Sequence, residues 1–254
     1  MRGVILAGGL GKRLQPLTLV TNKHLLPVYD RPMIYHPIQS LLNAGVEDVM
    51  IVTGGEHAGD FLKLLKNGKH LGIKHLEYAY QEGEGGIAEA LALAEDFADG
   101  GKICVALGDN IIEGNLREAA TNFLRQSSGA KLLLKEVSNP ERFGVAMVEN
   151  GQIREIVEKP SNPQSKLAVT GFYFYDSDVF EICRTLKPSR RGELEITDVN
   201  NAYLKRGELT HETLQGWWTD AGTIESLLLA NHLAAKTGTN RMELSDASTQ
   251  ESAR

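Results

Sequence analysis

Apolar residues in the first half of the chain alternate between short continuous runs and longer stretches with helical spacing. Short apolar runs bounded by turn residues are typical of buried strands, and apolar residues repeated every three or four positions predict amphipathic helices. The predicted strands are residues 3–7, 48–53, 75–80 and 102–107, and the helices between them are residues 33–44, 57–66 and 86–98. This is the order of βαβ units, so the pattern predicts a largely parallel sheet covered by helices.

The second half has a different pattern, in which strands follow one another through turn-rich segments. The strand-like stretches are residues 132–137, 143–149, 152–159 and 168–176, and helices are predicted at 177–186, 195–206 and 223–236. Successive strands favour antiparallel or mixed pairing, so we expect an added lobe across the first sheet. We predict a single α/β domain over residues 1–236, with halves of about 1–130 and 131–236. Residues 237–254 are polar and aperiodic, which is typical of a disordered tail.

Composition narrows the classes of partner. The 254 residues carry a net charge of −6, and no basic stripe offsets it, which argues against a nucleic-acid-binding surface. No stretch approaches the ~20 apolar residues of a membrane span, and the first residues lack the pattern of a signal peptide, so we expect a cytoplasmic protein without membrane partners. Cys104 and Cys183 lie in apolar segments and are predicted to be reduced core residues.

A glycine-rich segment follows the first predicted strand directly. Residues 6–18 read LAGGLGKRLQPLT and combine three glycines with Lys12 and Arg13. Glycine lets backbone N–H groups face a polyphosphate, and an arginine at the carboxyl end of a strand can hold phosphate oxygens bidentately. A turn with no ligand is the alternative for this segment taken alone. Leu6 and Leu14 stand where a P-loop and a dinucleotide fingerprint each require glycine, so neither of those loops is present.

Together with the segment after it, this loop resembles the opening of the glucose-1-phosphate thymidylyltransferases. Residues 6–18 match the family signature LAGG-x-G-[TS]-R-L-x-P-x-T except at Lys12, and the K-x-L-L-P-[VI] segment begins at Lys23. The resemblance covers about residues 1–235. It implies a three-layer nucleotidyltransferase fold and a reaction of dTTP with glucose 1-phosphate that yields dTDP-glucose and pyrophosphate. It also implies that Arg13 holds the triphosphate and Lys23 stabilises charge at the α-phosphate, although a lone lysine is more typical of a solvated surface.

Two aspartates are candidate metal ligands. Asp109 stands just past the strand predicted at 102–107, where a carboxylate can hold Mg²⁺ together with phosphate oxygens and water. A helix cap or turn residue is the alternative for an isolated aspartate there. Residues 217–223, WWTDAGT, resemble the family's W-x-D-x-G-T element. The resemblance implies that Asp220 and Asp109 bind one Mg²⁺ ion, which spacing alone does not show.

The sugar-phosphate site is implied by short elements of the second half that match the family in order: FGVA (143–146), EKP (158–160), VTG (169–171) and RGELEITD (191–198). By this resemblance, Gly144 and Val169 contact the hexose through backbone groups. Glu158 accepts hydrogen bonds from its hydroxyls, and Lys159 pairs with the 1-phosphate and aims the nucleophile. Asn110 is assigned to the same site.

The nucleotide site is implied in the same way. A glutamine amide such as that of Gln81 can donate to and accept from a pyrimidine edge at once, and Gly86 at a helix start permits close approach of the base. As a bare observation, Gln81 is a polar residue that ends a strand. The residues assigned to the nucleotide are Leu6, Ala7, Gly8, Gly9, Gly11, Arg13, Gln81, Gly86 and Asp109.

Departures from the family leave alternatives open. His24 replaces a usual glutamine and Lys12 replaces a small hydroxyl residue, so UTP or CTP in place of dTTP is an alternative. A glycosyltransferase and a catalytically silent sensor are further alternatives. The missing D-x-D motif argues against the first, and the retained Arg13 and aspartates argue against the second.

The family resemblance also suggests a homo-oligomer, either a tetramer or a dimer. The chain ends soon after the predicted helix at 223–236, where longer members add helices that form a regulatory site at a subunit interface. The chain therefore resembles a short form without those helices.

Overall fold

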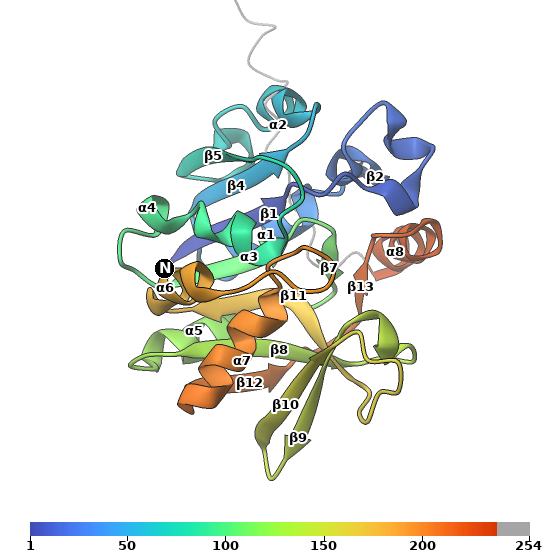
Figure 1. The fold of residues 1–254 in the computed structure, drawn as a ribbon. Helices are drawn as coiled ribbons and strands as arrows, with labels where there is room; N and C mark the ends of the chain where they lie inside the picture. The colour runs from blue at the N-terminus through green and yellow to red at the C-terminus, as the bar shows by residue number, and fades with distance from the viewer. Residues whose placement is uncertain (238–254) are drawn as a thin grey trace, which may run out of the picture.

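A single nine-stranded sheet forms the centre of the computed structural model, which describes residues 1–237 (Figure 1). Its order is β10-β9-β11-β6-β1-β4-β5, and β8 pairs with β11 and with β12. Strands β6, β1, β4 and β5 are mutually parallel, as predicted. The strands are β1 (Arg2–Ala7), β4 (Asp48–Gly54), β5 (His75–Gln81), β6 (Ile103–Leu107), β8 (Ala130–Glu136), β9 (Gly144–Glu149), β10 (Gln152–Glu158), β11 (Leu167–Tyr175) and β12 (Leu209–Thr213).

Strands of the second half extend this same sheet. Strand β11 runs antiparallel to β6 and also pairs with β8 and β9. The expected lobe across the sheet is therefore wrong in its placement, because the added strands continue the sheet edge to edge and the β9–β10 hairpin projects from its end (Figure 1). The tail predicted at 237–254 lies outside the described residues apart from Thr237, which ends the last helix.

Helices cover both faces of the sheet and make the fold three-layered. Successive side chains of a strand point to opposite faces. Accordingly, Val4 and Leu6 of β1 join one apolar cluster and Ile5 joins the other. The first cluster is covered by α3 (Ile87–Ala92), α4 (Glu95–Ala98), α6 (Asp178–Thr185) and α7 (Ile196–Arg206), and the second by α1 (Tyr35–Asn43), α2 (Ala58–Leu65) and α5 (Arg117–Arg125). The predicted α/β class is confirmed.

A third, smaller cluster fixes the segment after the glycine-rich loop. The short strands β2 (Pro27–Val28) and β3 (Arg31–Pro32) pair, and Val28 and Met33 pack with Leu227 of helix α8 (Ile224–Thr237). This packing holds the segment of residues 23–34 against helix α8. It thereby brings Lys23 toward the sheet. Single 3₁₀ turns fill the connections at Lys12–Leu14, Leu17–Leu19, Lys23–Leu25, Lys69–Leu71 and Pro140–Arg142.

Some elements differ from the prediction. The helix expected at 86–98 is two helices, because Ala94 N–H bonds to Leu91 O at 3.0 Å in a turn that interrupts the α-helical pattern. Helix α5 was not predicted, although Leu116, Ala119 and Phe123 have helical spacing and are buried. Strand β12 was missed because its LTHET sequence lacks the apolar run of a buried strand.

Both cysteines fit their predicted role. Cys104 and Cys183 are buried and free, and burial raises the pKa of the Cys183 thiol to about 12. Such thiols are poor nucleophiles and pack as small apolar side chains. Among residues 1–237, no helix combines the length and apolarity that crossing a bilayer requires.

His36 gives the fold a pH dependence that can be measured. Burial lowers its pKa to about 4, while Val28 O and Asp30 raise it and Arg31 lowers it. The unfolded chain therefore takes up the proton first, so the contribution of His36 to stability is present above pH 6.5 and lost toward pH 4. When the pH is lowered from 7 to 5, the unfolding free energy of both proteins should fall. We expect this fall, measured by urea titration, to be about 2 kcal/mol smaller in His36→Gln than in the wild type. The exposed His75→Gln is the control, and equal losses in His36→Gln and the wild type would contradict the assignment.

Candidate active site

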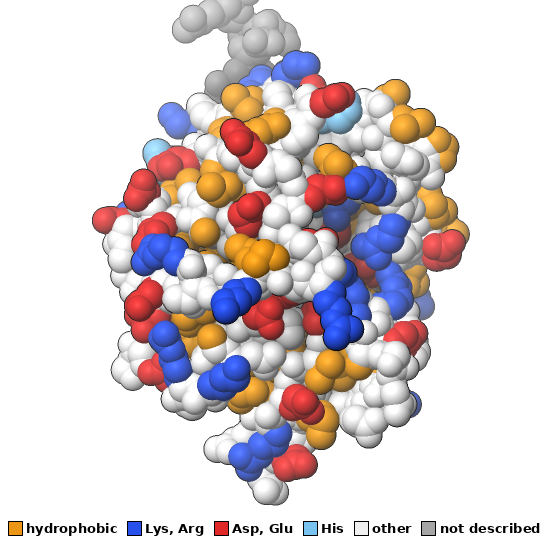
Figure 2. All heavy atoms as spheres, viewed as in Figure 1, with side chains coloured by type: hydrophobic (Ala, Val, Ile, Leu, Met, Phe, Trp, Pro, Cys, Tyr) orange, Lys and Arg blue, Asp and Glu red, His pale blue; other side chains and the backbone are white. Residues whose placement is uncertain are grey.

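One cavity of about 320 Å³ opens at the carboxyl ends of the parallel strands and contains most of the predicted site residues. This is the edge where open α/β sheets bind ligands. In the view of Figure 2, lysine and arginine side chains gather between the β2 hairpin and the β9–β10 strands, with acidic side chains among them. The predicted residues that line the cavity are Leu6, Gly8, Gly9, Arg13, Lys23, Gln81, Gly86, Asp109, Asn110, Gly144, Glu158, Lys159, Val169 and Asp220.

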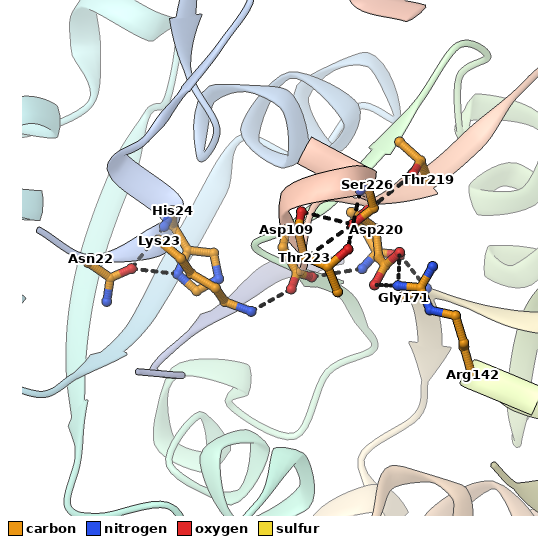
Figure 3. Close-up of polar contacts among 11 residues, drawn as sticks. Asn22, Lys23, His24, Asp109, Arg142, Gly171, Thr219, Asp220, Thr223 and Ser226 are labelled. Carbon is orange, nitrogen blue, oxygen red and sulfur yellow. Dashed lines mark hydrogen bonds and ion pairs between the residues drawn. The ribbon is translucent and has the colours of Figure 1, made fainter. Parts of the chain in front are cut away.

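A small sheet brings the two predicted metal aspartates together. Strand β7 (Asn110–Ile112) pairs with β13 (Trp218–Asp220), and Asp220 is the register partner of Asn110. Asp109 O accepts a 2.8 Å hydrogen bond from the N–H of Ala221. A Cβ atom built on Gly222 would lie 3.2 Å from Asp220 Oδ2 and 3.6 Å from Asp109 Oδ2, so the carboxylates converge (Figure 3).

Each carboxylate is paired with a cation. Lys23 Nζ donates to Asp109 Oδ2 at 2.5 Å, and Arg142 Nη2 donates to the two oxygens of Asp220 at 3.1 and 3.2 Å (Figure 3). Arg13 Nη2 lies 3.1 Å from the same point above Gly222. The cavity therefore holds two acids and several cations at its centre.

The electrostatics of the two acids differ. Burial by itself would raise the pKa of Asp109, but the Lys23 ammonium and other neighbours outweigh it and hold that pKa well below its usual range. Burial raises the pKa of Asp220, and the Asp109 charge adds to this effect, while Arg142, Arg13 and Lys23 oppose it. A further cation between the two carboxylates would relieve their repulsion.

Asn110 holds the first aspartate in place. Its Nδ2 donates to Asp109 Oδ1 at 3.0 Å, and its Oδ1 accepts from Trp218 Nε1 at 2.7 Å and from the Gly171 N–H at 2.9 Å. A Cβ on Gly171 would lie 2.4 Å from the Asn110 side chain, so glycine is required there. These contacts use most of the hydrogen-bonding capacity of the Asn110 amide. Asn110 therefore orients Asp109 and also lines the cavity.

At the other end of the cavity, the predicted sugar residues surround Gly144. A Cβ built there would lie 3.4 Å from Glu158 Oε2 and 3.9 Å from Val169 Cβ. Glu158 Oε2 accepts a 2.6 Å hydrogen bond from Thr197 Oγ1, and its Oε1 lies 3.6 Å from Arg191 Nη2. A carboxylate set among hydroxyl and backbone groups suits a polyol.

Lys159 adopts an unusual backbone conformation at this end. Its φ is 44°, which is rare for a residue with a side chain and costs about 1–2 kcal/mol. The N–H of Lys159 donates to Phe143 O at 3.0 Å, and its Nζ lies 3.4 Å from Glu158 Oε1. The fold therefore holds a cation beside Glu158 against a local conformational cost.

Comparison with known proteins identifies the family. The model of the nucleotidyl transferase family matches residues 2–237. The chain belongs to this family.

The chain also resembles individual members. A glucose-1-phosphate thymidylyltransferase of Neisseria meningitidis is 46% identical over 235 residues, which are 89% of this chain and 80% of that protein. A Bacillus anthracis protein assigned to the same activity and solved with sucrose is 54% identical, with a TM-score of 0.89 over 93% of this chain and 96% of that one. A UDP-glucose pyrophosphorylase solved with UDP-glucose is 25% identical, with a TM-score of 0.82 over 92% of this chain and 98% of its own. The predicted resemblance and nucleotidyltransferase fold are confirmed.

Not every predicted residue of this nucleotidyltransferase lines the cavity. Ala7 is fully buried in an apolar cluster, and Gly11 makes a left-handed turn, with a φ of 66°, behind the loop. A Cβ on Gly11 would lie 2.9 Å from Lys23 Cβ, so this glycine allows the loop to pack against the lysine. Neither residue lines the cavity, and the assignment of Ala7 and Gly11 to the nucleotide site stays a prediction that would involve their backbone groups.

Sequence reasoning missed other residues of the nucleotidyltransferase cavity. Arg142 lies one position before the FGVA element, and Thr197 lies inside RGELEITD, so the matched elements could have indicated both. Trp218 packs on Phe143 with ring centroids 4.9 Å apart and also lines the cavity.

The residues present fit a magnesium ion better than a metal held by protein alone. In the described part of the chain, no three or more His, Cys, Asp or Glu side chains are grouped as a metal site. Asp109 and Asp220 converge as a half-buried pair of hard oxygen donors. Mg²⁺ needs no more than this when substrate phosphates and water complete its coordination.

Proposed function

We propose that this nucleotidyltransferase condenses dTTP with α-D-glucose 1-phosphate and forms dTDP-glucose and pyrophosphate. The observation that carries the proposal is one cavity in which the acid pair Asp109 and Asp220 and the cations Arg13 and Lys23 lie between Gln81 at one end and Glu158 at the other. Relatives named glucose-1-phosphate thymidylyltransferase support the same pair of substrates.

Gln81 supports a choice among pyrimidines. Its Nε2 donates to Glu89 Oε2 at 2.7 Å and to Gly86 O at 3.1 Å, which leaves Oε1 as the free acceptor. Glu89 can only accept, so it fixes the amide in this orientation. Thymine and uracil present an N–H donor at the ring position where cytosine presents an acceptor. An acceptor at Gln81 therefore favours dTTP and UTP over CTP.

Gly86 serves the same region through packing. Its φ is 101°, and a Cβ there would lie 2.6 Å from Leu194 O, so a side chain would displace the loop before α7. We propose that Gly86 also permits the close approach of the base, in addition to meeting this packing requirement.

In the proposed reaction, an oxygen of the sugar 1-phosphate attacks the α-phosphorus of the nucleotide, and the bond to the β-phosphate oxygen breaks as pyrophosphate leaves. Both substrates are anions, so the chain must neutralise charge and align them. Lys159 holds and aims the 1-phosphate, and Arg13 holds the triphosphate. Lys23 is half-buried beside Asp109 and moves from this carboxylate to the charge that develops at the α-phosphate.

We propose that Asp109 and Asp220 hold Mg²⁺, which would neutralise phosphate charge when bound. With a cation present, neither carboxylate needs its resting partner, so Lys23 and Arg142 become available to the phosphates. The chain thereby keeps its buried charges balanced with and without substrates.

Pyrophosphate release with glucose 1-phosphate and each of dTTP, UTP and CTP tests the proposal. We expect kcat/KM to be highest for dTTP and at least about a hundredfold lower for CTP, because the wrong base edge leaves buried polar groups unpaired. Gln81→Leu should reduce the discrimination between dTTP and CTP. A preference for UTP or CTP, or no turnover with glucose 1-phosphate, would contradict the proposed substrates.

We also propose a cytoplasmic homo-oligomer, either a dimer or a tetramer. Two free, buried cysteines suit a reducing compartment. Leu19 and Val20 are 64% and 80% exposed, and exposed apolar residues are typical of contact surfaces. Sedimentation equilibrium at micromolar concentration checks the state, and a monomer would contradict it.

A further inference from the structure

An ion pair crosses the nucleotide end of the cavity and is not used by the mechanism above. Lys12 Nζ lies 2.6 Å from Glu84 Oε2. Lys12 belongs to the glycine-rich loop, next to Arg13, and Glu84 belongs to the loop between β5 and α3. Glu84 lines the cavity, so the Lys12 ammonium is held at the cavity's edge.

The surroundings of this pair favour a phosphate as a competing partner. Gly8 and Gly9 of the same loop line the cavity, and a Cβ on Gly9 would lie 3.8 Å from Lys23 Nζ. The loop therefore lies directly against the cation that serves the phosphates. Arg13, the neighbour of Lys12, already reaches the point above Gly222 where the two carboxylates converge.

Exposure makes the pair easy to exchange. The side chains of Lys12 and Glu84 are 65% and 49% exposed, and ion pairs at such positions contribute little to stability. A triphosphate carries several negative charges and presents many acceptor oxygens, so it attracts an ammonium group more strongly than one solvated carboxylate does. A lysine side chain is long and flexible enough to change partners without backbone movement.

We propose that Lys12 is an additional triphosphate-binding residue whose ion pair with Glu84 is the resting state, exchanged for the phosphates when the nucleotide binds. This inference rests on the proposed function of the cavity as a nucleotide site. Glu84 then opposes nucleotide binding in two ways, because it competes for Lys12 and adds a negative charge where the phosphates enter.

Steady-state kinetics of four variants test the exchange. We expect Lys12→Met to raise the KM for dTTP about tenfold and to change kcat less, since a contact made equally in ground and transition states affects binding alone. Glu84→Gln should lower KM severalfold, because the competitor is removed. The double variant should keep a KM well above that of the wild type, since Lys12 contacts the phosphates itself, but below that of Lys12→Met, since the opposing charge of Glu84 is gone. Lys12→Arg, which keeps the charge, should restore most of the affinity.

A matched control uses another exposed lysine pair. Lys63 Nζ lies 2.9 Å from Asp60 Oδ1 on α2, and neither residue lines the cavity. Lys63→Met should keep the wild-type KM. An unchanged KM in Lys12→Met overturns the proposal. A double variant with the wild-type KM also overturns it, because Lys12 would then only screen Glu84.

The same variants separate this inference from the choice of substrate. Calorimetric titration with inorganic tripolyphosphate, which has no base or sugar, should give a weaker Kd in Lys12→Met and a tighter one in Glu84→Gln. These shifts in the Kd for tripolyphosphate do not depend on the nucleotide base, so they are expected even if the enzyme prefers UTP to dTTP. Equal tripolyphosphate affinity in the wild type and both variants overturns the role of Lys12, whichever nucleotide is used.

Discussion

Replacing Asp220 by asparagine is expected to lower kcat about a thousandfold or more and to leave the fold intact. Asp220 and Asp109 are the paired carboxylates of the cavity, and an amide in place of one removes the charge that would hold a divalent cation against the phosphates. Pyrophosphate release at increasing MgCl₂ concentration gives the measurement. Wild-type turnover in the variant would contradict a metal role for Asp220.

A measurement of thermal stability should show that this loss of kcat in Asp220→Asn does not come from unfolding. Burial and the neighbouring Asp109 charge raise the pKa of Asp220, so its carboxylate is in an unfavourable place when ionised. An asparagine removes that repulsion, and its former partner Arg142 is 31% exposed and can be solvated. We therefore expect an unchanged or higher Tm. Asp178→Asn is the control, because Asp178 makes an exposed pair with Arg206 and should keep full activity.

The parallel part of the sheet was predictable because its strands are buried on both faces. The continuous apolar runs of β1, β4 and β6 reflect that burial directly. The direction in which β11 joins β6 was not predictable, since side-chain pattern does not distinguish an edge-to-edge extension from a lobe that crosses the sheet. Pattern also missed the interruption at Ala94, which depends on one local hydrogen bond.

The site was predictable where a motif names its residues and not where the contact is tertiary. Asp109 and Asp220 came from separate motifs, but their convergence depends on the pairing of β7 with β13, two short strands far apart in sequence. Arg142 stands next to a matched element, but nothing in that element shows the contact with Asp220 that defines its role. The strand alternation that places Ile5 in the core places Ala7 there too, so any contact of Ala7 with the nucleotide would use its backbone groups.

Replacing Lys23 by methionine is expected to lower kcat a hundredfold to a thousandfold, roughly the effect of removing one group that stabilises transition-state charge. The same change should cost about 3–5 kcal/mol of unfolding free energy, because it leaves a buried carboxylate without its partner. Lys23 and Asp109 are 14% and 13% exposed, so solvent compensates little. Urea unfolding and single-turnover assays on the folded fraction measure the two losses separately.

A second buried lysine tells these two effects apart. Lys131 of β8 is 6% exposed and pairs with Glu212 of β12, and it does not line the cavity. Lys131→Met removes the cationic partner of Glu212, which is 28% exposed, so we expect a loss of stability without a loss of turnover per folded molecule. If Lys23→Met loses only as much activity as Lys131→Met at equal folded fraction, Lys23 is a structural ion-pair partner and does not act on the phosphates. If its activity falls much further, the cation beside Asp109 takes part in the chemistry.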